Sequence, residues 1–129
     1  AIHSRKFDPE RVGFFRSFLE NLQSREVEVA VSHDLRAFLN SVGLGHFPFI
    51  SFQQLTELPP LDFVFSVGGD GTLLDTVAMV RELHIPIVGI NTGRLGFLAT
   101  IPRNQVHQAL DWIESGNYAL DERILVQAD

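Results

Sequence analysis

A glycine-rich stretch, Gly68-Gly69-Asp70-Gly71-Thr72, directly follows an apolar run and has the composition of a phosphate-binding turn. Glycines have no Cβ, so backbone amides can approach a phosphate group, and a helix starting there would add its positive dipole. Asp70 is the unusual residue, because a carboxylate beside phosphate repels the ligand unless it binds a metal or accepts a proton. From the spacing alone, Asp70 is equally well interpreted as a catalytic carboxylate or as a helix cap.

Two familiar phosphate motifs do not fit this stretch. A P-loop requires Gly-x-x-x-x-Gly-Lys-Ser/Thr, and no Lys follows Lys6 in the chain. A dinucleotide fingerprint could use Gly69 and Gly71, but it would place Leu74 at the third glycine and Asn91 where an acid should bind the ribose. The spacing therefore excludes the P-loop and argues against a dehydrogenase.

The elements that must position this stretch alternate between strands and helices. Apolar residues at helical spacing predict helices over 8–25, 32–43, 71–83 and 102–114, and β-rich runs predict strands at 1–4, 27–31, 62–67 and 85–90. This alternation predicts a three-layer α/β/α domain with a mostly parallel, Rossmann-like sheet. Ligands of such sheets bind beyond the carboxyl ends of the strands, which directs attention to the loops after Val67 and Ile90.

Some of these elements carry more specific expectations. Asp8 is expected to cap the first helix. The helix over 71–83 is predicted from four apolar residues at helical spacing, which are Leu74, Val77, Ala78 and Leu83. The segment 44–58 is interpreted as an irregular strand that covers the core with its aromatic residues, Phe47, Phe49 and Phe52, the alternatives being a ligand wall or a subunit contact.

Composition excludes several classes of protein. The chain has 129 residues, a net charge of -6 and no run of Lys or Arg, which argues against nucleic acid or an anionic membrane as the main partner. No Cys is present, which excludes disulfides and thiolate metal sites. No apolar run approaches the roughly 20 residues that span a bilayer, and the 5 His residues lack metal-ligand spacing. We therefore expect a cytoplasmic domain.

A resemblance to a known family rests on two motifs. The run Gly-Gly-Asp-Gly-Thr at 68–72, followed by Asn91-Thr-Gly-Arg-Leu-Gly-Phe-Leu-Ala99, resembles the NAD kinases. The first motif is shared with diacylglycerol and sphingosine kinases and, in a close version, with 6-phosphofructokinases. The second motif narrows the choice among these families to the NAD kinases. The opening Ile2-His-Ser-Arg-Lys-Phe7 also looks like the first strand and loop of bacterial members.

The resemblance implies transfer of the γ-phosphoryl group of ATP to the 2′-hydroxyl of the adenosine ribose of NAD, giving NADP, with Mg²⁺ or another divalent cation. Asp70 would be the general base or a metal ligand. The residues that would border the nucleotides are Gly68, Gly69, Asp70, Gly71, Thr72 and, as an apolar wall, Phe97. Asn91 and Arg94 are further candidates. Asp75 departs from the family, in which many members carry a basic or another polar residue, and this puts one ligand contact in doubt.

The same resemblance predicts how the protein is organised. Residues 1–120 would be the N-terminal α/β domain, and residues 121–129 would begin the crossing into a second, mostly β domain outside the chain. We expect the 129 residues to be inactive alone, and the full-length enzyme to be a cytoplasmic homo-oligomer that binds neither nucleic acid nor membranes. The alternatives are a related lipid or sugar-phosphate kinase and a nucleotide-binding module without catalysis.

Overall fold

A single sheet forms the centre of the molecule. The computed structural model describes residues 1–5, 9–92, 101–115, 119–120 and 125–127. The strands are β1 (Ile2–His3), β2 (Val29–Ser32), β3 (Phe49–Phe52), β4 (Val64–Gly68), β5 (Ile87–Asn91), β6 (Ile101–Pro102), β7 (Ala119–Leu120) and β8 (Leu125–Gln127). Their order is β3-β2-β1-β4-β5-β8-β7, and β6 pairs with β5 outside this order. Of the described pairs, β7–β8 is antiparallel and the others are parallel, so the prediction of a mostly parallel sheet is confirmed.

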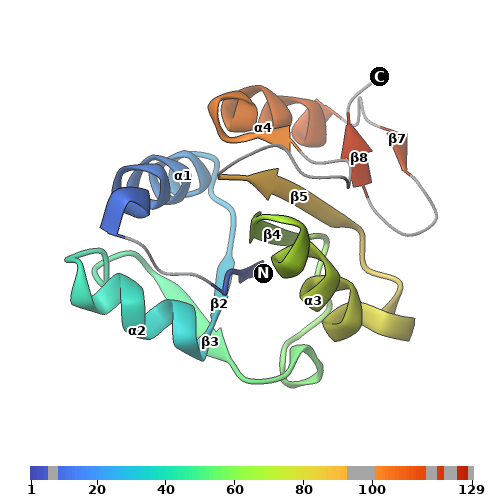
Figure 1. Ribbon diagram of the computed structural model, residues 1–129, viewed down its shortest axis with the longest axis horizontal. Helices are drawn as coiled ribbons and strands as arrows, with labels where there is room; N and C mark the ends of the chain where they lie inside the picture. Colours follow the sequence, from blue (N-terminus) through green and yellow to red (C-terminus); the bar gives the residue numbers. More distant parts are fainter. Residues whose placement is uncertain (6–8, 93–100, 116–118, 121–124, 128–129) are drawn as a thin grey trace.

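Helices cover both faces of this sheet. They are α1 (Val12–Ser24), α2 (His33–Ser41), α3 (Asp70–Val80) and α4 (Val106–Ser115), with 3₁₀ turns at Pro9–Arg11, Leu55–Glu57, Arg81–Leu83 and Arg103–Gln105. One apolar cluster joins α1, α2 and α4 to one face, and a second joins α3 to the other. Figure 1 shows β4 and β5 between α3 and the pair α1 and α4. The predicted three-layer α/β/α architecture is confirmed.

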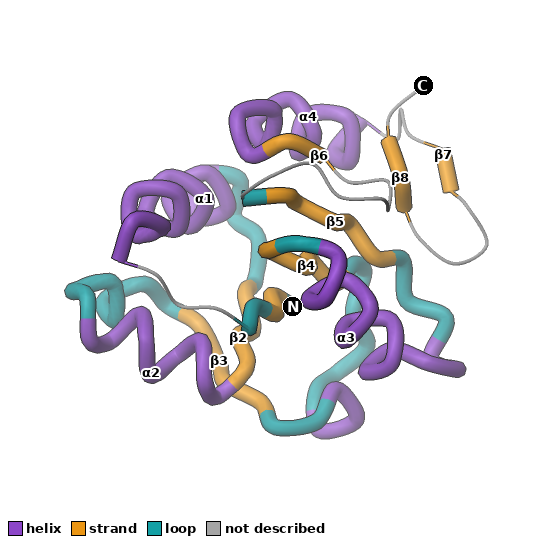
Figure 2. The backbone as a smooth tube through the Cα atoms, viewed as in Figure 1, coloured by secondary structure: helices purple, strands orange, loops and turns teal. Residues whose placement is uncertain are grey.

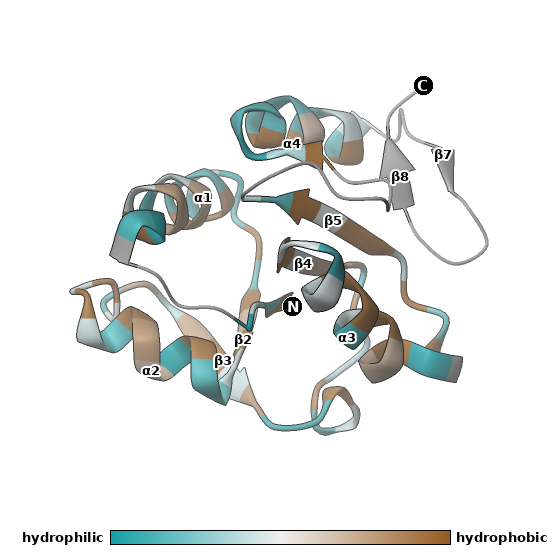
Figure 3. Cartoon of the chain, viewed as in Figure 1, coloured by the Kyte–Doolittle hydropathy of each residue, from teal (hydrophilic) through white to brown (hydrophobic). Residues whose placement is uncertain are grey.

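The core forms where the sequence is most apolar. Strands β4 and β5 are buried along their whole length, as is usual for parallel strands covered on both faces, and Figure 3 shows them mostly in the hydrophobic colour. Helix α1 buries Phe15, Phe18, Leu19 and Leu22, which share one face at helical spacing. The rings of Phe18 and Phe65 meet edge to face at a centroid distance of 5.2 Å, which fixes α1 against β4.

The third predicted helix is present, but its buried face is not the one that the spacing of its apolar residues marks. Helix α3 buries Thr72, Leu73, Thr76 and Val80, whereas Leu74 is 60% exposed and Leu83, in the following 3₁₀ turn, is 42% exposed. Of the predicted set, Val77 is half-buried and Ala78 is exposed. The hydroxyl of Thr76 donates to the carbonyl of Thr72 at 2.8 Å, which satisfies this polar group inside the helix and allows it to be buried. The spacing of apolar residues cannot identify a buried helix face that includes Thr side chains.

Other differences concern the ends of elements. Val27 was predicted in the second strand, but it precedes β2 and is 42% exposed. A 3₁₀ turn precedes α1, and the expected cap Asp8 lies outside the described residues. In the long connection from β2 to β4 (Figure 2), Phe47 and Phe52 are buried and Phe49 packs against the core. The interpretation of these aromatics as core residues is confirmed.

Candidate active site

Three neighbouring strands end together at one edge of the sheet. Strand β4 lies between β1 and β5, and the parallel register pairs His3 with Ser66 and Gly68 with Asn91. The chain segments that follow these strands are consequently close in space although they are distant in sequence. This carboxyl edge contains the glycine-rich turn and the first residues of the loop after β5, as the rule for parallel sheets predicts.

The glycine-rich turn is tight at Gly68. This residue has a φ of +153°, and a Cβ there would lie 2.5 Å from Oγ1 of Thr72, so the position accepts only glycine without rearrangement. Gly69 caps α3, and its carbonyl accepts the amide of Leu73 at 3.1 Å, closing the first helical turn. The amide of Thr92 donates to the carbonyl of Gly68 at 3.3 Å, which ties the two strand-end loops together. The amides at the start of α3 therefore face this edge.

Asp70 is the first residue of α3 and is half-buried. The N-cap position belongs to Gly69, and no side chain makes a cap hydrogen bond there, so the interpretation of Asp70 as the helix cap was wrong. Its carboxylate lies in the first turn, where the positive end of the helix dipole stabilises negative charge. Of its neighbours, Gly71 is exposed, whereas Thr72 is buried with its hydroxyl against Gly68.

Buried polar groups gather at the same edge. Ser66, Asn91 and Thr92 are at most 7% exposed. The hydroxyls of Ser66 and Thr92 have no hydrogen-bond partner among the residues that the structure describes. Buried polar atoms without a partner are uncommon in folded proteins, and a bound ligand is one group that can satisfy them. These groups lie beside the glycine-rich turn, which makes this edge the candidate ligand site.

The segment after β1 also reaches the turn, which sequence reasoning missed. The hydroxyl of Ser4 donates to the carbonyl of Val67 at 2.8 Å, and Nη1 of Arg5 donates to the carbonyl of Gly71 at 3.3 Å. One signal was available in the sequence. If the first strand is parallel and adjacent to the strand ending at Val67, the residues that follow it must also lie at the carboxyl edge. Strand adjacency could not be read from the sequence.

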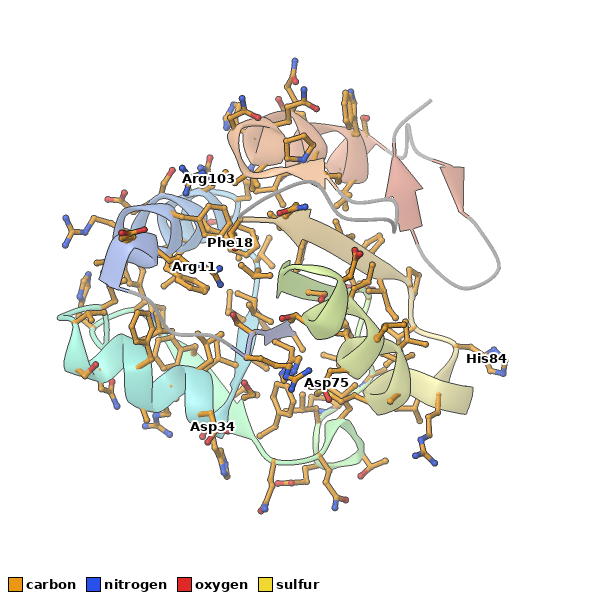
Figure 4. All side chains as sticks on the ribbon, viewed as in Figure 1. Arg11, Phe18, Asp34, Asp75, His84 and Arg103 are labelled. Carbon is orange, nitrogen blue, oxygen red and sulfur yellow. The ribbon has the colours of Figure 1, made fainter. Side chains whose placement is uncertain are left out.

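Asp75, the departure from the family pattern, has a partner in this chain. Its Oδ2 lies 2.5 Å from Nε2 of His3, with side-chain exposures of 42% and 12% respectively. Figure 4 labels Asp75 on α3. The carboxylate therefore joins α3 to β1 across the sheet edge.

Two predicted site residues, Arg94 and Phe97, lie outside the described residues. Within the described part of the chain, no group of three or more acidic, His or Cys side chains could hold a metal, and no helix could cross a membrane. A cavity of about 910 Å³ opens at the opposite edge, lined by residues such as Ala1, Val29 and Phe49. None of its lining residues belongs to the glycine-rich turn.

Comparison with protein families gives a match over residues 54–118 to the N-terminal domain of the ATP-NAD kinases. These residues contain the glycine-rich turn, β5 and α4. Among curated proteins, the NAD kinase of Cytophaga hutchinsonii is 38% identical over 129 residues, covering 98% of this chain and 44% of its own length. The NAD kinase of Acidithiobacillus ferrooxidans is 35% identical, covering 98% of this chain and 41% of its own length.

A solved structure has the same fold. The crystal structure of yeast NADH kinase complexed with NADH superposes with a TM-score of 0.75 at 18% identity, over 91% of this chain and 38% of the yeast chain. The chain thus spans 38–44% of the length of these relatives.

Proposed function

The chain belongs to the NAD kinase family, and we propose that it forms the phosphate-binding part of an enzyme that phosphorylates NAD. In the proposed reaction, the γ-phosphoryl group of ATP is transferred to the 2′-hydroxyl of the adenosine ribose of NAD, giving NADP and ADP. The observation that carries the proposal is the position of Asp70, a carboxylate in the first turn of α3 inside a glycine-rich phosphate turn.

In this mechanism Asp70 acts as the general base. A ribose hydroxyl is a poor nucleophile at neutral pH, and a carboxylate within hydrogen-bond range takes its proton while the new oxygen–phosphorus bond forms. The bond between the γ-phosphorus and the β,γ-bridging oxygen breaks, and the electron pair leaves with ADP. The proton from the acceptor hydroxyl remains on the carboxyl group until solvent removes it.

The glycine-rich turn supplies positioning and charge stabilisation. Amides at the start of α3 would bind phosphate oxygens, and the helix dipole adds to their effect. Gly68, Gly69, Gly71 and Thr72 would border the phosphates mainly with their backbone, because the hydroxyl of Thr72 is turned toward Gly68.

A divalent cation fits this donor set, because Mg²⁺ commonly binds one or two carboxylates together with substrate phosphates. Asp70 is the residue that would hold it, in which case the carboxylate would be a metal ligand rather than the base. When bound, the ion would neutralise charge on the phosphate oxygens during transfer.

The acceptor side of the site lies largely outside the described residues. We propose that Phe97 forms an apolar wall against the dinucleotide, that Arg94 pairs with a ligand phosphate, and that Asn91 belongs to the same acceptor side. Residues 1–120 would form the N-terminal domain, and 121–129 would start the crossing into a second, β-rich domain that completes the site. The proposal of a second domain is supported by the length of the Cytophaga relative, of which this chain covers 44%. The full-length enzyme would be a cytoplasmic homo-oligomer.

An acceptor panel tests this proposal. The full-length protein, supplied with ATP and Mg²⁺, is offered NAD, diacylglycerol and fructose 6-phosphate in separate reactions, and the product is identified by mass spectrometry and phosphorus NMR. We expect a single phosphate on the 2′-oxygen of NAD. Phosphorylation of the lipid or the sugar with no NADP would contradict the proposal and support a related kinase, and ATP binding without any product would support a non-catalytic module.

A further inference from the structure

A cationic side chain from the beginning of the chain lies at the glycine-rich turn. Arg5 follows β1, is exposed, and donates from Nη1 to the carbonyl of Gly71 at 3.3 Å, across 66 residues of sequence. We propose that Arg5 binds phosphate groups of the nucleotides at this site; this inference rests on the proposed function, which places such phosphates at the turn.

Consecutive residues fix Arg5 in this place. His3 contacts Asp75 of α3, the hydroxyl of Ser4 donates to the carbonyl of Val67 in β4, and Arg5 contacts Gly71. Each of the three residues is thus bonded to β4 or α3, the two elements that flank the turn. The backbone that carries the guanidinium is therefore held in place before any ligand binds.

The charge of the residues at this edge favours a cationic side chain beside the phosphates. The chain has a net charge of -6, and the first two turns of α3 carry Asp70 and Asp75, which repel an anionic ligand. Asp75 is engaged by His3. Among the described residues, Arg5 has one hydrogen bond and no carboxylate partner. A guanidinium has five N–H donors in a planar fork that matches phosphate oxygens, so most of its donors are available to a ligand.

A second observation at the same edge also points to a ligand. The hydroxyl of Thr92 is buried, 7% of the residue being exposed, and has no partner among the described residues. The amide of Thr92 binds the carbonyl of Gly68, so this hydroxyl lies beside the turn that Arg5 flanks from its other side. In a P-loop, a Lys supplies the positive charge that binds the phosphates. No Lys follows Lys6 in this chain, so a Lys after the turn cannot supply that charge here.

Calorimetry on the full-length protein tests the proposal. Affinities for ATP with Mg²⁺ and for NAD are measured separately for the wild type, Arg5→Gln and Arg5→Lys. The matched control is Arg81→Gln, because Arg81 is an exposed Arg that donates to a carbonyl, that of Ala78 at 2.9 Å, at the opposite end of α3. Thermal midpoints are recorded for all variants to separate binding from folding.

We expect Arg5→Gln to lower the affinity for one of the two nucleotides by about 10- to 100-fold, the usual loss for a charge-assisted hydrogen bond. Arg5→Lys should recover part of this affinity. Arg81→Gln should leave both affinities unchanged. Weaker ATP binding identifies the donor triphosphate as the ligand of Arg5, and weaker NAD binding identifies the pyrophosphate of the acceptor. Unchanged affinity for both nucleotides overturns the proposal, and a lowered thermal midpoint with unchanged affinities would leave Arg5 as a cap of the Gly71 carbonyl.

Because binding is measured without turnover, failure of the proposed function would be seen separately. A wild-type protein that binds ATP through Arg5 but forms no NADP would contradict the proposed function alone.

Discussion

Two adjacent glycines in the phosphate turn differ in what constrains them. Gly68 has a φ of +153° and a Cβ there would lie 2.5 Å from the hydroxyl of Thr72, whereas a Cβ on Gly69 would meet no atom within 4 Å. We expect Gly68→Ala to destabilise the fold by about 2–6 kcal/mol, since overpacking and backbone strain each cost roughly 1–3 kcal/mol. Urea unfolding measures this loss.

Gly69→Ala is the matched control. Its φ of -109° is open to alanine, so the expected cost is about 1 kcal/mol or less, from the weaker cap. Equal loss of stability for the two variants would mean that the contact between Gly68 and Thr72 does not determine the turn.

Residue by residue, the sequence could predict the glycine-rich turn but not its neighbours. A motif of five consecutive residues keeps its geometry wherever the fold places it, so Gly68 to Thr72 could be recognised as a unit. The pair of His3 and Asp75 spans 72 residues and depends on which strands are adjacent. Pairing of this kind is decided by the whole sheet, and no local spacing indicates it.

At the scale of elements, β1 is held at its amino end by an unusual contact. In a 129-residue chain that begins at Ala1, the amino group of Ala1 donates to the carbonyl of Phe63 at 2.9 Å, and burial lowers the pKa of this group from 8.0 to about 6, against an opposing effect of Asp62. The unfolded chain therefore binds a proton between pH 6 and 8 that the folded chain does not. Stability is then greatest above about pH 8 and falls as the pH is lowered to about 6.

We expect the 129-residue chain to gain at most about 2–3 kcal/mol between pH 6 and 8 from this amine, because one pKa unit corresponds to about 1.4 kcal/mol. Urea midpoints at both pH values measure the gain. Acetylation of the amino group removes the titration but keeps an N–H donor, so the acetylated chain should lose this part of the pH dependence. Identical pH dependence in both forms would show that the amine is not buried in solution.

The elements themselves were largely predictable, and their errors have physical causes. Helices and buried strands lie where the spacing of apolar residues predicts them, because that spacing reflects which side chains the fold buries. Helix α3 deviated because two of its inward residues are Thr72 and Thr76, whose hydroxyls have local partners or neighbours. Strand ends shifted by about two residues because pairing with neighbours, rather than composition, decides where a strand stops.

At the scale of the whole molecule, the two edges of the sheet differ. The carboxyl edge carries the turn, the buried hydroxyls and Arg5, while a cavity of about 910 Å³ lies at the amino edge. In the proposed enzyme a second domain supplies a wall against the acceptor ribose, so the turn by itself would not fix that ribose in line.

We expect the 129-residue chain to unfold cooperatively in urea yet to form no NADP above background from ATP, Mg²⁺ and NAD. Correct orientation of two substrates can lower the activation barrier by up to roughly 7–11 kcal/mol. Losing several kcal/mol of this contribution makes turnover undetectable in an ordinary assay. The full-length protein, prepared in the same way, is the control. NADP formation by the 129 residues at a rate near that of the full-length protein would show that no further domain is needed.

The central claim is that Asp70 performs the chemistry, and turnover of Asp70→Asn in the full-length protein tests it most directly. Asn keeps the size of the side chain but cannot accept the proton, so turnover should fall by roughly 10²–10⁴ while NAD affinity stays within about tenfold. Asp62→Asn is the control, since Asp62 precedes β4 at the opposite edge of the sheet and should leave turnover unchanged. Turnover of Asp70→Asn within about threefold of the wild type would contradict a catalytic role for this carboxylate.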